Sequence, residues 1–274
     1  MSQDSSSHSA KPLRAPQDLP AAFEHFDEIA RLMRQQTVLC LDYDGTLSPI
    51  VPNPKDAVLG DAMRQQLEAV ARLIPVAIVS GRGLSFIREQ VALDTVYYAG
   101  SHGFEIVGPK GFQHELPEAQ DALPLLDQTE QKLEQQLSGI TGAEVERKKY
   151  GIAIHYRRVA EAEQAAVKQA VKALGQQESA LKLGKGKMVL ELKPNIDWHK
   201  GKAIHFIADH ITSAGETPYI VYIGDDITDE DAFQSIKHGA GILVGAHAED
   251  SAADYRLQDV EAVQRFLQQL TEKL

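Results

Sequence analysis

Short apolar runs separated by helical patterns recur toward both ends of this chain. The runs are almost wholly apolar and lack the alternation of a half-exposed strand, which indicates strands buried on both faces. Amphipathic periodicity marks the segments between them, so the pattern predicts an α/β fold whose parallel sheet is covered by helices on both sides. The predicted strands are 37–41, 76–79, 96–99, 219–223 and 242–244, and the predicted helices include 21–35, 61–74, 85–91 and 260–274.

The middle of the chain, from about Pro109 to Pro194, follows a different rhythm. Leucine and valine at helical spacing mark helices near 126–137 and 167–174, and alternation marks 150–156 as a half-exposed strand. Gly-Lys-Gly-Lys at 184–187 separates two short apolar segments, which is typical of a hairpin. The pattern predicts an inserted second domain, an antiparallel sheet with helices on one face.

These rhythms divide the chain into four segments. Residues 1–20 contain Ser, Asp, Gln and Pro but no apolar block, so we expect a flexible tail and no secretory signal. The parallel-sheet core comprises 21–108 and 195–274, and the inserted domain comprises 109–194.

Composition narrows the class of protein. With 274 residues and 43 % hydrophobic content, the chain has the make-up of an ordinary globular protein of one large or two smaller domains. The net charge of −11 argues against a nucleic-acid partner, and no apolar stretch is long enough to cross a bilayer. Cys40 is the only cysteine and excludes a disulfide within the chain, so we expect a cytoplasmic protein without a membrane or nucleic-acid partner.

Two carboxylates, Asp42 and Asp44, follow directly on the apolar run 37–41. Such acids at a strand tip cost free energy unless a cation or donors compensate them, which suggests a divalent metal. Asp42 could attack phosphorus, and Asp44 could then exchange protons with the leaving group and water. A calcium loop is the alternative, but its sixth and twelfth positions would be Leu47 and Asn53 instead of Gly and Glu.

Three further groups of candidate residues lie at the ends of predicted strands or at the start of a predicted helix. Asp225, after the run 219–223, is placed to bind the cation, and Asp229, one turn later, to hold metal-bound water. Ser80 ends its strand ahead of a glycine and could hold phosphoryl oxygens. Lys200 begins a predicted helix, where it could neutralise transition-state charge or simply lie in solvent.

Taken together, these clusters resemble the four motifs of the haloacid dehalogenase (HAD) phosphatases, in order. The motifs are Asp42-Tyr43-Asp44-Gly45-Thr46-Leu47, Ser80-Gly81-Arg82, Lys200-Gly201 and the segment 224–230. Within that superfamily the chain resembles the trehalose-6-phosphate phosphatase family over roughly 37–244, on the segments 47–50, 100–103, 191–194 and 225–230.

The resemblance implies a Rossmann-like core with a C2-type α+β cap. It implies Mg²⁺-dependent hydrolysis of trehalose 6-phosphate through an aspartyl-phosphate on Asp42, with Asp44 as acid and base. It places Mg²⁺ on Asp42, Asp225 and the main-chain oxygen of Asp44, and the phosphoryl group on Ser80 and Lys200.

The resemblance also implies sugar-binding residues in the cap. Glu191 and Lys193 match glucose-binding positions, and Lys148 fits a third by its spacing to His155, although Arg147 and Lys149 are adjacent alternatives. The rival functions are a different HAD sugar phosphatase, acting on sucrose phosphate or a hexose phosphate, and a non-catalytic sugar-phosphate sensor.

Overall fold

The apolar run at 37–41 forms β1 (Thr37–Leu41) in the middle of the core sheet. Its side chains alternate, so that Leu39 and Leu41 pack on one face of the sheet while Val38 and Cys40 pack on the other. Both faces are buried, which explains why the run carries no polar alternation. The structure, a computed structural model, describes residues 10–53, 56–186, 188–213 and 215–274.

The core sheet extends to both sides of β1, and within the described residues it has eight strands. Six neighbouring strands run parallel, and the last two continue the sheet as an antiparallel hairpin. In spatial order the strands are β12 (Tyr255–Leu257), β11 (Gly239–Val244), β10 (Tyr219–Gly224), β1, β2 (Val76–Val79), β3 (Tyr97–Gly100), β4 (Glu105–Gly108) and β5 (Phe112–Glu115).

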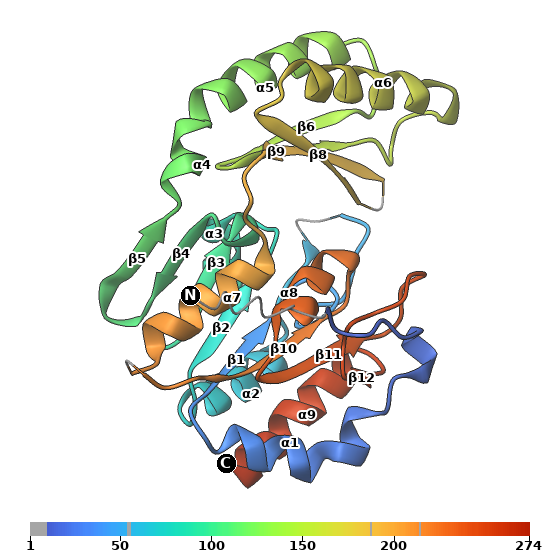
Figure 1. Cartoon of the computed structure of the whole chain (residues 1–274). Coiled ribbons are helices and arrows are strands. Elements are labelled where there is room, and N and C mark those ends of the chain that lie inside the picture. Colours follow the sequence, from blue (N-terminus) through green and yellow to red (C-terminus); the bar gives the residue numbers. More distant parts are fainter. Residues whose placement is uncertain (1–9, 54–55, 187, 214) are drawn as a thin grey trace, which may run out of the picture.

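Helices cover both faces of this sheet (Figure 1). One face packs against α1 (Phe26–Met33), α2 (Asp61–Ala71), α3 (Leu84–Val91) and α9 (Val260–Lys273). The other packs against α7 (Lys200–Ile211) and α8 (Glu230–Ser235). Short 3₁₀ turns complete the core: η1 (Pro16–Asp18), η2 (Ala22–His25), η4 (Ser101–Gly103), η5 (Pro109–Gly111) and η6 (Ile227–Asp229).

The cap is a separate α+β unit above the core (Figure 1). Its antiparallel sheet has the order β6 (Glu144–Lys148), β7 (Gly151–His155), β9 (Val189–Pro194), β8 (Leu181–Gly186). The helices α5 (Leu123–Leu137) and α6 (Glu161–Gln177) cover its outer face, and α4 (Pro117–Asp121) precedes them. The opposite face of the sheet is directed toward the core.

The predicted fold class is confirmed: a mostly parallel, helix-covered sheet carries an inserted antiparallel cap with helices on one face. The boundary expected at Pro109 differs, because β5 still belongs to the core sheet and the chain leaves the core after Glu115. The short hairpin β4–β5 turns through Gly108 to Gly111, and that turn accounts for the change of rhythm in the sequence.

The expected flexible tail also differs where the structure describes it. Arg14 and Ser251 exchange backbone hydrogen bonds, and Lys11 forms an ion pair with Asp254 at 2.7 Å. Leu19 is buried in the core. Residues 10–20 therefore lie against the core, while the rest of the predicted tail, 1–9, lies outside the described residues.

Among the described helices, none combines the length and apolar character needed to cross a membrane.

Candidate active site

The predicted site residues converge at the carboxyl ends of the core strands, where open α/β sheets bind ligands. There a pocket of about 400 Å³ lies between the core and the inner face of the cap sheet. All but one of the predicted residues line it: Asp42, Asp44, Ser80, Lys148, Glu191, Lys193, Lys200 and Asp225. The exception is Asp229, which lies beneath the pocket and is fully buried.

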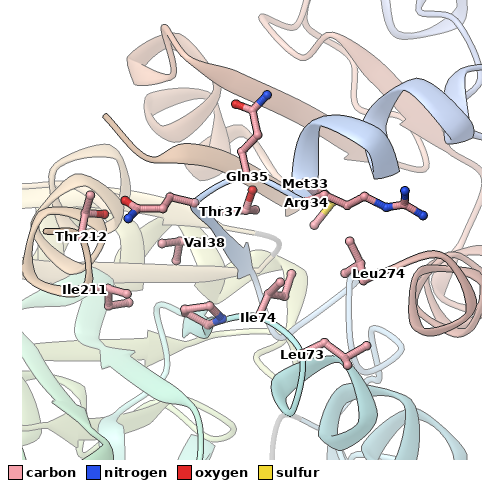
Figure 2. A pocket seen from close by; sticks show the side chains of 12 residues that line it. Met33, Arg34, Gln35, Thr37, Val38, Leu73, Ile74, Ile211, Thr212 and Leu274 are labelled. Carbon is pink, nitrogen blue, oxygen red and sulfur yellow. The ribbon is translucent and has the colours of Figure 1, made fainter. Parts of the chain in front are cut away.

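A second hollow, of about 370 Å³, lies at the opposite ends of the strands (Figure 2). Thr37 and Val38, at the start of β1, line it together with residues near the end of α1 and of α7. None of the predicted site residues lines this hollow. The chemistry that the sequence predicts therefore concentrates in the pocket beneath the cap.

A buried network of charged groups lies at the base of the pocket. Lys200 Nζ is 2.6 Å from Asp229 Oδ1 and 3.0 Å from Asp42 Oδ1. The Tyr222 hydroxyl donates a second hydrogen bond to Asp229 Oδ1, at 2.5 Å. Because Lys200 is the first residue of α7, the start of that helix fixes the ammonium group between the tips of β1 and β10.

Burial and neighbouring charges shift the pKa values of this network. Burial raises the pKa of Asp42 to about 7, against the opposing attraction of Lys200. Burial alone would lower the pKa of Lys200, but the carboxylates of Asp229 and Asp42 outweigh it and raise that pKa above its ordinary value. Lys200 is therefore a permanently charged, desolvated cation beside Asp42.

Asp225 provides the clearest sign of a cation site. Burial raises its pKa to about 9, and the nearby carboxylates of Asp42 and Asp229 add to the shift. In the part of the chain that the structure describes, Asp225 Oδ1 is buried and receives no hydrogen bond. Carboxylate oxygens of these three aspartates lie within 4.8 Å of one another, so the donor set fits a hard divalent cation such as Mg²⁺.

Asp229, which the sequence predicts to hold a metal-bound water, has its carboxylate surrounded by protein donors. Its Oδ2 accepts hydrogen bonds from the backbone amides of Asp225 and Asp226, both at 2.9 Å. Its Oδ1 accepts from Lys200 and Tyr222. With four protein donors on its two oxygens, Asp229 fixes the position of Lys200 and of the turn that carries Asp225.

Gly45 makes room for the Asp225 carboxylate. Its φ is +77°, and a Cβ at this position would lie 2.0 Å from Asp225 Oδ2. Only glycine satisfies both the left-handed backbone and this close approach. The absence of a side chain at Gly45 therefore allows the Asp225 carboxylate to lie close to the turn that carries Asp42 and Asp44.

Gly45→Ala is expected to lower kcat by about a hundredfold, because an active-site carboxylate displaced by about 1 Å loses its productive geometry. Gly111→Ala is the matched control: its φ is +78°, but no atom lies within 4 Å of the added Cβ. Turnover kinetics and thermal unfolding of the two variants should show similar stability losses and a kcat loss only at Gly45. Equal kcat values would show that the contact with Asp225 is unimportant.

Asp44 is held by Arg82. The guanidinium donates two hydrogen bonds to the carboxylate, Nε to Oδ2 at 2.7 Å and Nη2 to Oδ1 at 2.6 Å. Such bidentate pairs fix orientation as well as charge. Arg82 also lies over the Phe86 ring, 4.7 Å from its centroid, which anchors the guanidinium from the other side. Arg82 belongs to the motif Ser80-Gly81-Arg82, and its side chain pairs with Asp44 in the structure.

Ser80 directly follows β2, lines the pocket and is buried. Its hydroxyl accepts a hydrogen bond from the Arg82 amide at 3.1 Å, and its carbonyl accepts one from the His102 amide at 2.9 Å. These bonds join the turn after β2 to the turn after β3. Ser80 is thus presented on a rigid turn rather than on a free loop.

The inner face of the cap sheet supplies the opposite wall. Along β9, Leu190 and Leu192 pack beneath the cap helices, so the alternating Glu191 and Lys193 are directed to the pocket. Glu191 Oε1 forms an ion pair with Lys148 Nζ at 2.7 Å. Burial opposes ionisation of Glu191, but Lys148 and a hydrogen bond from His102 hold its pKa well below the usual range.

The structure separates three neighbouring basic residues, of which the sequence favours Lys148 by its spacing to His155. Lys148 lines the pocket, whereas Arg147 pairs with Asp127 on α5 at 2.8 Å and Lys149 pairs with Glu115 at 2.5 Å. The register of β6 explains why Arg147 lies away from the pocket. Arg147 pairs across the strands with Ile152, whose side chain lies in the cap core, so both side chains are on the helix-covered face of the sheet. Alternation along β6 therefore brings Lys148 alone of the three to the pocket.

Two residues of the site carried no assigned role in the sequence: Tyr222 and His102. Tyr222 lies inside an apolar strand and looks like core, so only the fold reveals its bond to Asp229. His102 belongs to a segment that resembles the phosphatase family, but nothing in its spacing connects it to Glu191, 3.5 Å away.

Comparison with known proteins agrees with this geometry. The family model described as trehalose-phosphatase matches residues 40–261. Trehalose-phosphate phosphatase B of Arabidopsis thaliana is 40 % identical over 266 residues, covering 92 % of this chain and 71 % of that protein. The chain belongs to the trehalose-phosphatase family. It is therefore an enzyme, a phosphoric monoester hydrolase.

Solved structures share its fold. The C-terminal domain of C. albicans trehalose-6-phosphate phosphatase superimposes with a TM-score of 0.76 at 21 % identity, covering 93 % of this chain and 98 % of that one. A haloacid dehalogenase-like hydrolase from B. subtilis gives a TM-score of 0.54 at 14 % identity, covering 85 % and 99 %. The trehalose-phosphatase family and the HAD-like fold thus agree with the resemblance seen in the sequence.

Proposed function

We propose that this phosphatase hydrolyses trehalose 6-phosphate to trehalose and phosphate, with Mg²⁺ as cofactor and Asp42 as nucleophile. The observation that carries the proposal is the single pocket in which Asp42 and Lys200 of the core face Glu191 and Lys193 of the cap. The names of the relatives, trehalose-phosphate phosphatases, support the choice of substrate.

The reaction has two steps. In the first, a carboxylate oxygen of Asp42 bonds to phosphorus, the bond from phosphorus to the sugar oxygen breaks, and Asp44 gives that oxygen a proton. In the second, water attacks the aspartyl-phosphate, Asp44 takes up a proton from the water, and the bond between phosphorus and Asp42 breaks. Phosphate leaves, and both aspartates return to their starting state.

Lys200 and Ser80 stabilise the phosphoryl group in this proposal. Lys200 Nζ, 3.0 Å from Asp42 Oδ1, is a fixed cation where charge builds on the transferring group. Ser80 lies on the turn after β2, where its hydroxyl and the neighbouring amides can donate to phosphoryl oxygens. Asp229 positions Lys200 through their ion pair at 2.6 Å.

Asp42, Asp225 and the main-chain oxygen of Asp44 would hold Mg²⁺. The bound ion supplies Lewis-acid stabilisation of the negatively charged phosphoryl oxygens. The buried Oδ1 of Asp225 and the raised pKa values of Asp42 and Asp225 support a cation at this place.

Recognition of the sugar falls to the cap. Glu191, Lys193 and Lys148 present an acceptor and two donors suited to several hydroxyl groups of a disaccharide. A site built to bond hydroxyls rejects analogues that leave its buried polar groups unpaired. The side chains of Ile50, which is two-thirds exposed, and Phe86 add apolar surface to the core side of the same pocket.

Phosphate release from trehalose 6-phosphate, sucrose 6-phosphate and glucose 6-phosphate tests the proposal. With Mg²⁺, we expect kcat/KM on trehalose 6-phosphate to exceed that on the other two by at least about a hundredfold. EDTA should abolish turnover, and added Mg²⁺ should restore it. Preference for another sugar phosphate would reassign the substrate, and full activity in EDTA would remove the metal from the account.

A further inference from the structure

One of the contacts between the cap and the core runs through the carboxylate of Glu191. Its Oε1 binds Lys148 of the cap, and its Oε2 lies 3.5 Å from Nε2 of His102, which belongs to the core. Lys148 Nζ also reaches the core, 3.4 Å from the carbonyl of Gly81. One pair of cap side chains therefore meets two core groups: Gly81 in the turn after β2 and His102 in the turn after β3.

His102 is held in place by its backbone. Its amide donates to the Ser80 carbonyl at 2.9 Å, and the preceding amide of Ser101 donates to the Arg82 carbonyl at 2.7 Å. The φ of His102 is +60°, a left-handed conformation that is unfavourable for a non-glycine residue. The surrounding hydrogen bonds thus maintain a strained backbone that directs the imidazole toward the cap.

The opposite side of the imidazole contacts Gly81. A Cβ on Gly81 would lie 2.8 Å from His102 Cε1, so a residue with a side chain there would displace the ring. The imidazole is mostly buried, and this burial lowers the pKa of His102 to about 4. A neutral ring can donate one hydrogen bond to Glu191 without adding a further cation to the sugar site.

We propose that His102 is a positioning residue for the reaction: it fixes Glu191, and with it the cap, in the register that places the sugar-binding side chains over Asp42. This inference rests on the proposed role of Glu191 in sugar recognition. The imidazole acts through Glu191, so its removal should weaken the use of sugar phosphates and leave the chemistry at Asp42 intact.

Consequently, His102→Ala should reduce kcat/KM for trehalose 6-phosphate by roughly 10- to 100-fold. Turnover of a small aryl phosphate, which needs no sugar contact, should stay within about twofold of wild type and so report an intact Ser80 turn. His102→Asn should recover part of the loss, because asparagine tolerates a left-handed backbone and carries an amide donor. An equal loss on both substrates would overturn the proposal.

The double variant His102→Ala/Glu191→Ala provides the sharper test. If His102 acts through Glu191, the double variant should match Glu191→Ala alone within about twofold. If the two single losses multiply, His102 acts independently and the proposal is wrong. If the wild type prefers a sugar phosphate other than trehalose 6-phosphate, the proposed substrate is wrong but the comparison of variants still holds. The comparison is then made on the preferred compound.

A substrate-free measurement addresses the same contact. Spin labels at the exposed positions Gln136, on the cap, and Gln268, on the core, report the distance between the two lobes. His102→Ala should broaden that distance distribution relative to wild type, and His102→Asn should narrow it again. Identical distributions in all three proteins would show that His102 does not fix the cap.

Discussion

Replacing Asp42 by asparagine is expected to lower kcat on trehalose 6-phosphate by about 10⁴-fold or more, because the amide cannot form the phosphoryl ester. The change is nearly isosteric and removes a buried carboxylate whose pKa burial raises to about 7. Lys200 keeps its ion pair with Asp229. We therefore expect the fold to survive while turnover is lost, and phosphate release together with thermal unfolding measures both.

Asp94→Asn is the matched control, since Asp94 is exposed and lies outside the pocket. It should turn over substrate at the wild-type rate. Mass spectrometry of acid-quenched wild type should also find the phosphoryl adduct on Asp42. An adduct on another residue, or hydrolysis that persists in Asp42→Asn, would contradict the mechanism. A sugar-phosphate sensor, by contrast, would show no turnover in the wild type and would bind the ligand equally well after the substitution.

Truncating both Glu191 and Lys193 to alanine should cost trehalose 6-phosphate hydrolysis about 10³-fold in kcat/KM. Hydrolysis of p-nitrophenyl phosphate should change by no more than a few fold, because the aryl group engages none of the cap side chains. The two substrates should differ because sugar contacts and chemistry come from different domains. The cap strand β9 supplies Glu191 and Lys193, and the core supplies Asp42 and Lys200.

The control for this pair is Glu163→Ala/Lys172→Ala, which removes the same two charges from exposed positions on α6. It should leave both substrates unaffected. If Glu191→Ala/Lys193→Ala impaired the two substrates equally, the cap would act only as a structural cover, and its proposed part in choosing the sugar would fail.

The fold was predictable where burial alone shapes the pattern. Strands β1, β2 and β10 are apolar on both faces, and their ends in the sequence agree with the structure within one residue. The strands β5 and β6 read Phe-Gln-His-Glu and Glu-Val-Glu-Arg-Lys, which carry no such pattern. Their pairing with β4 and β7 makes them strands, and that is a tertiary effect.

The candidate site was predictable where one short segment carries the chemistry. Asp42, Asp44 and Asp225 follow buried strands, so the common edge of the sheet brings them together. Contacts between individual side chains could not be predicted from the sequence, since no spacing rule links Tyr222 to Asp229 or His102 to Glu191. Their roles depend on side-chain packing that forms only in the folded protein.

The segment 10–20 has a consequence for handling the protein. The carbonyl of Pro20 accepts a hydrogen bond from the Arg256 amide at 3.0 Å, and Ala21 pairs with the same residue, so the outermost strand β12 is already occupied on its free side. Strands left open at a sheet margin recruit other copies of a chain. A truncated protein beginning after Ala21 would expose the edge of β12. We expect it to precipitate at high concentration while its catalytic activity stays unchanged.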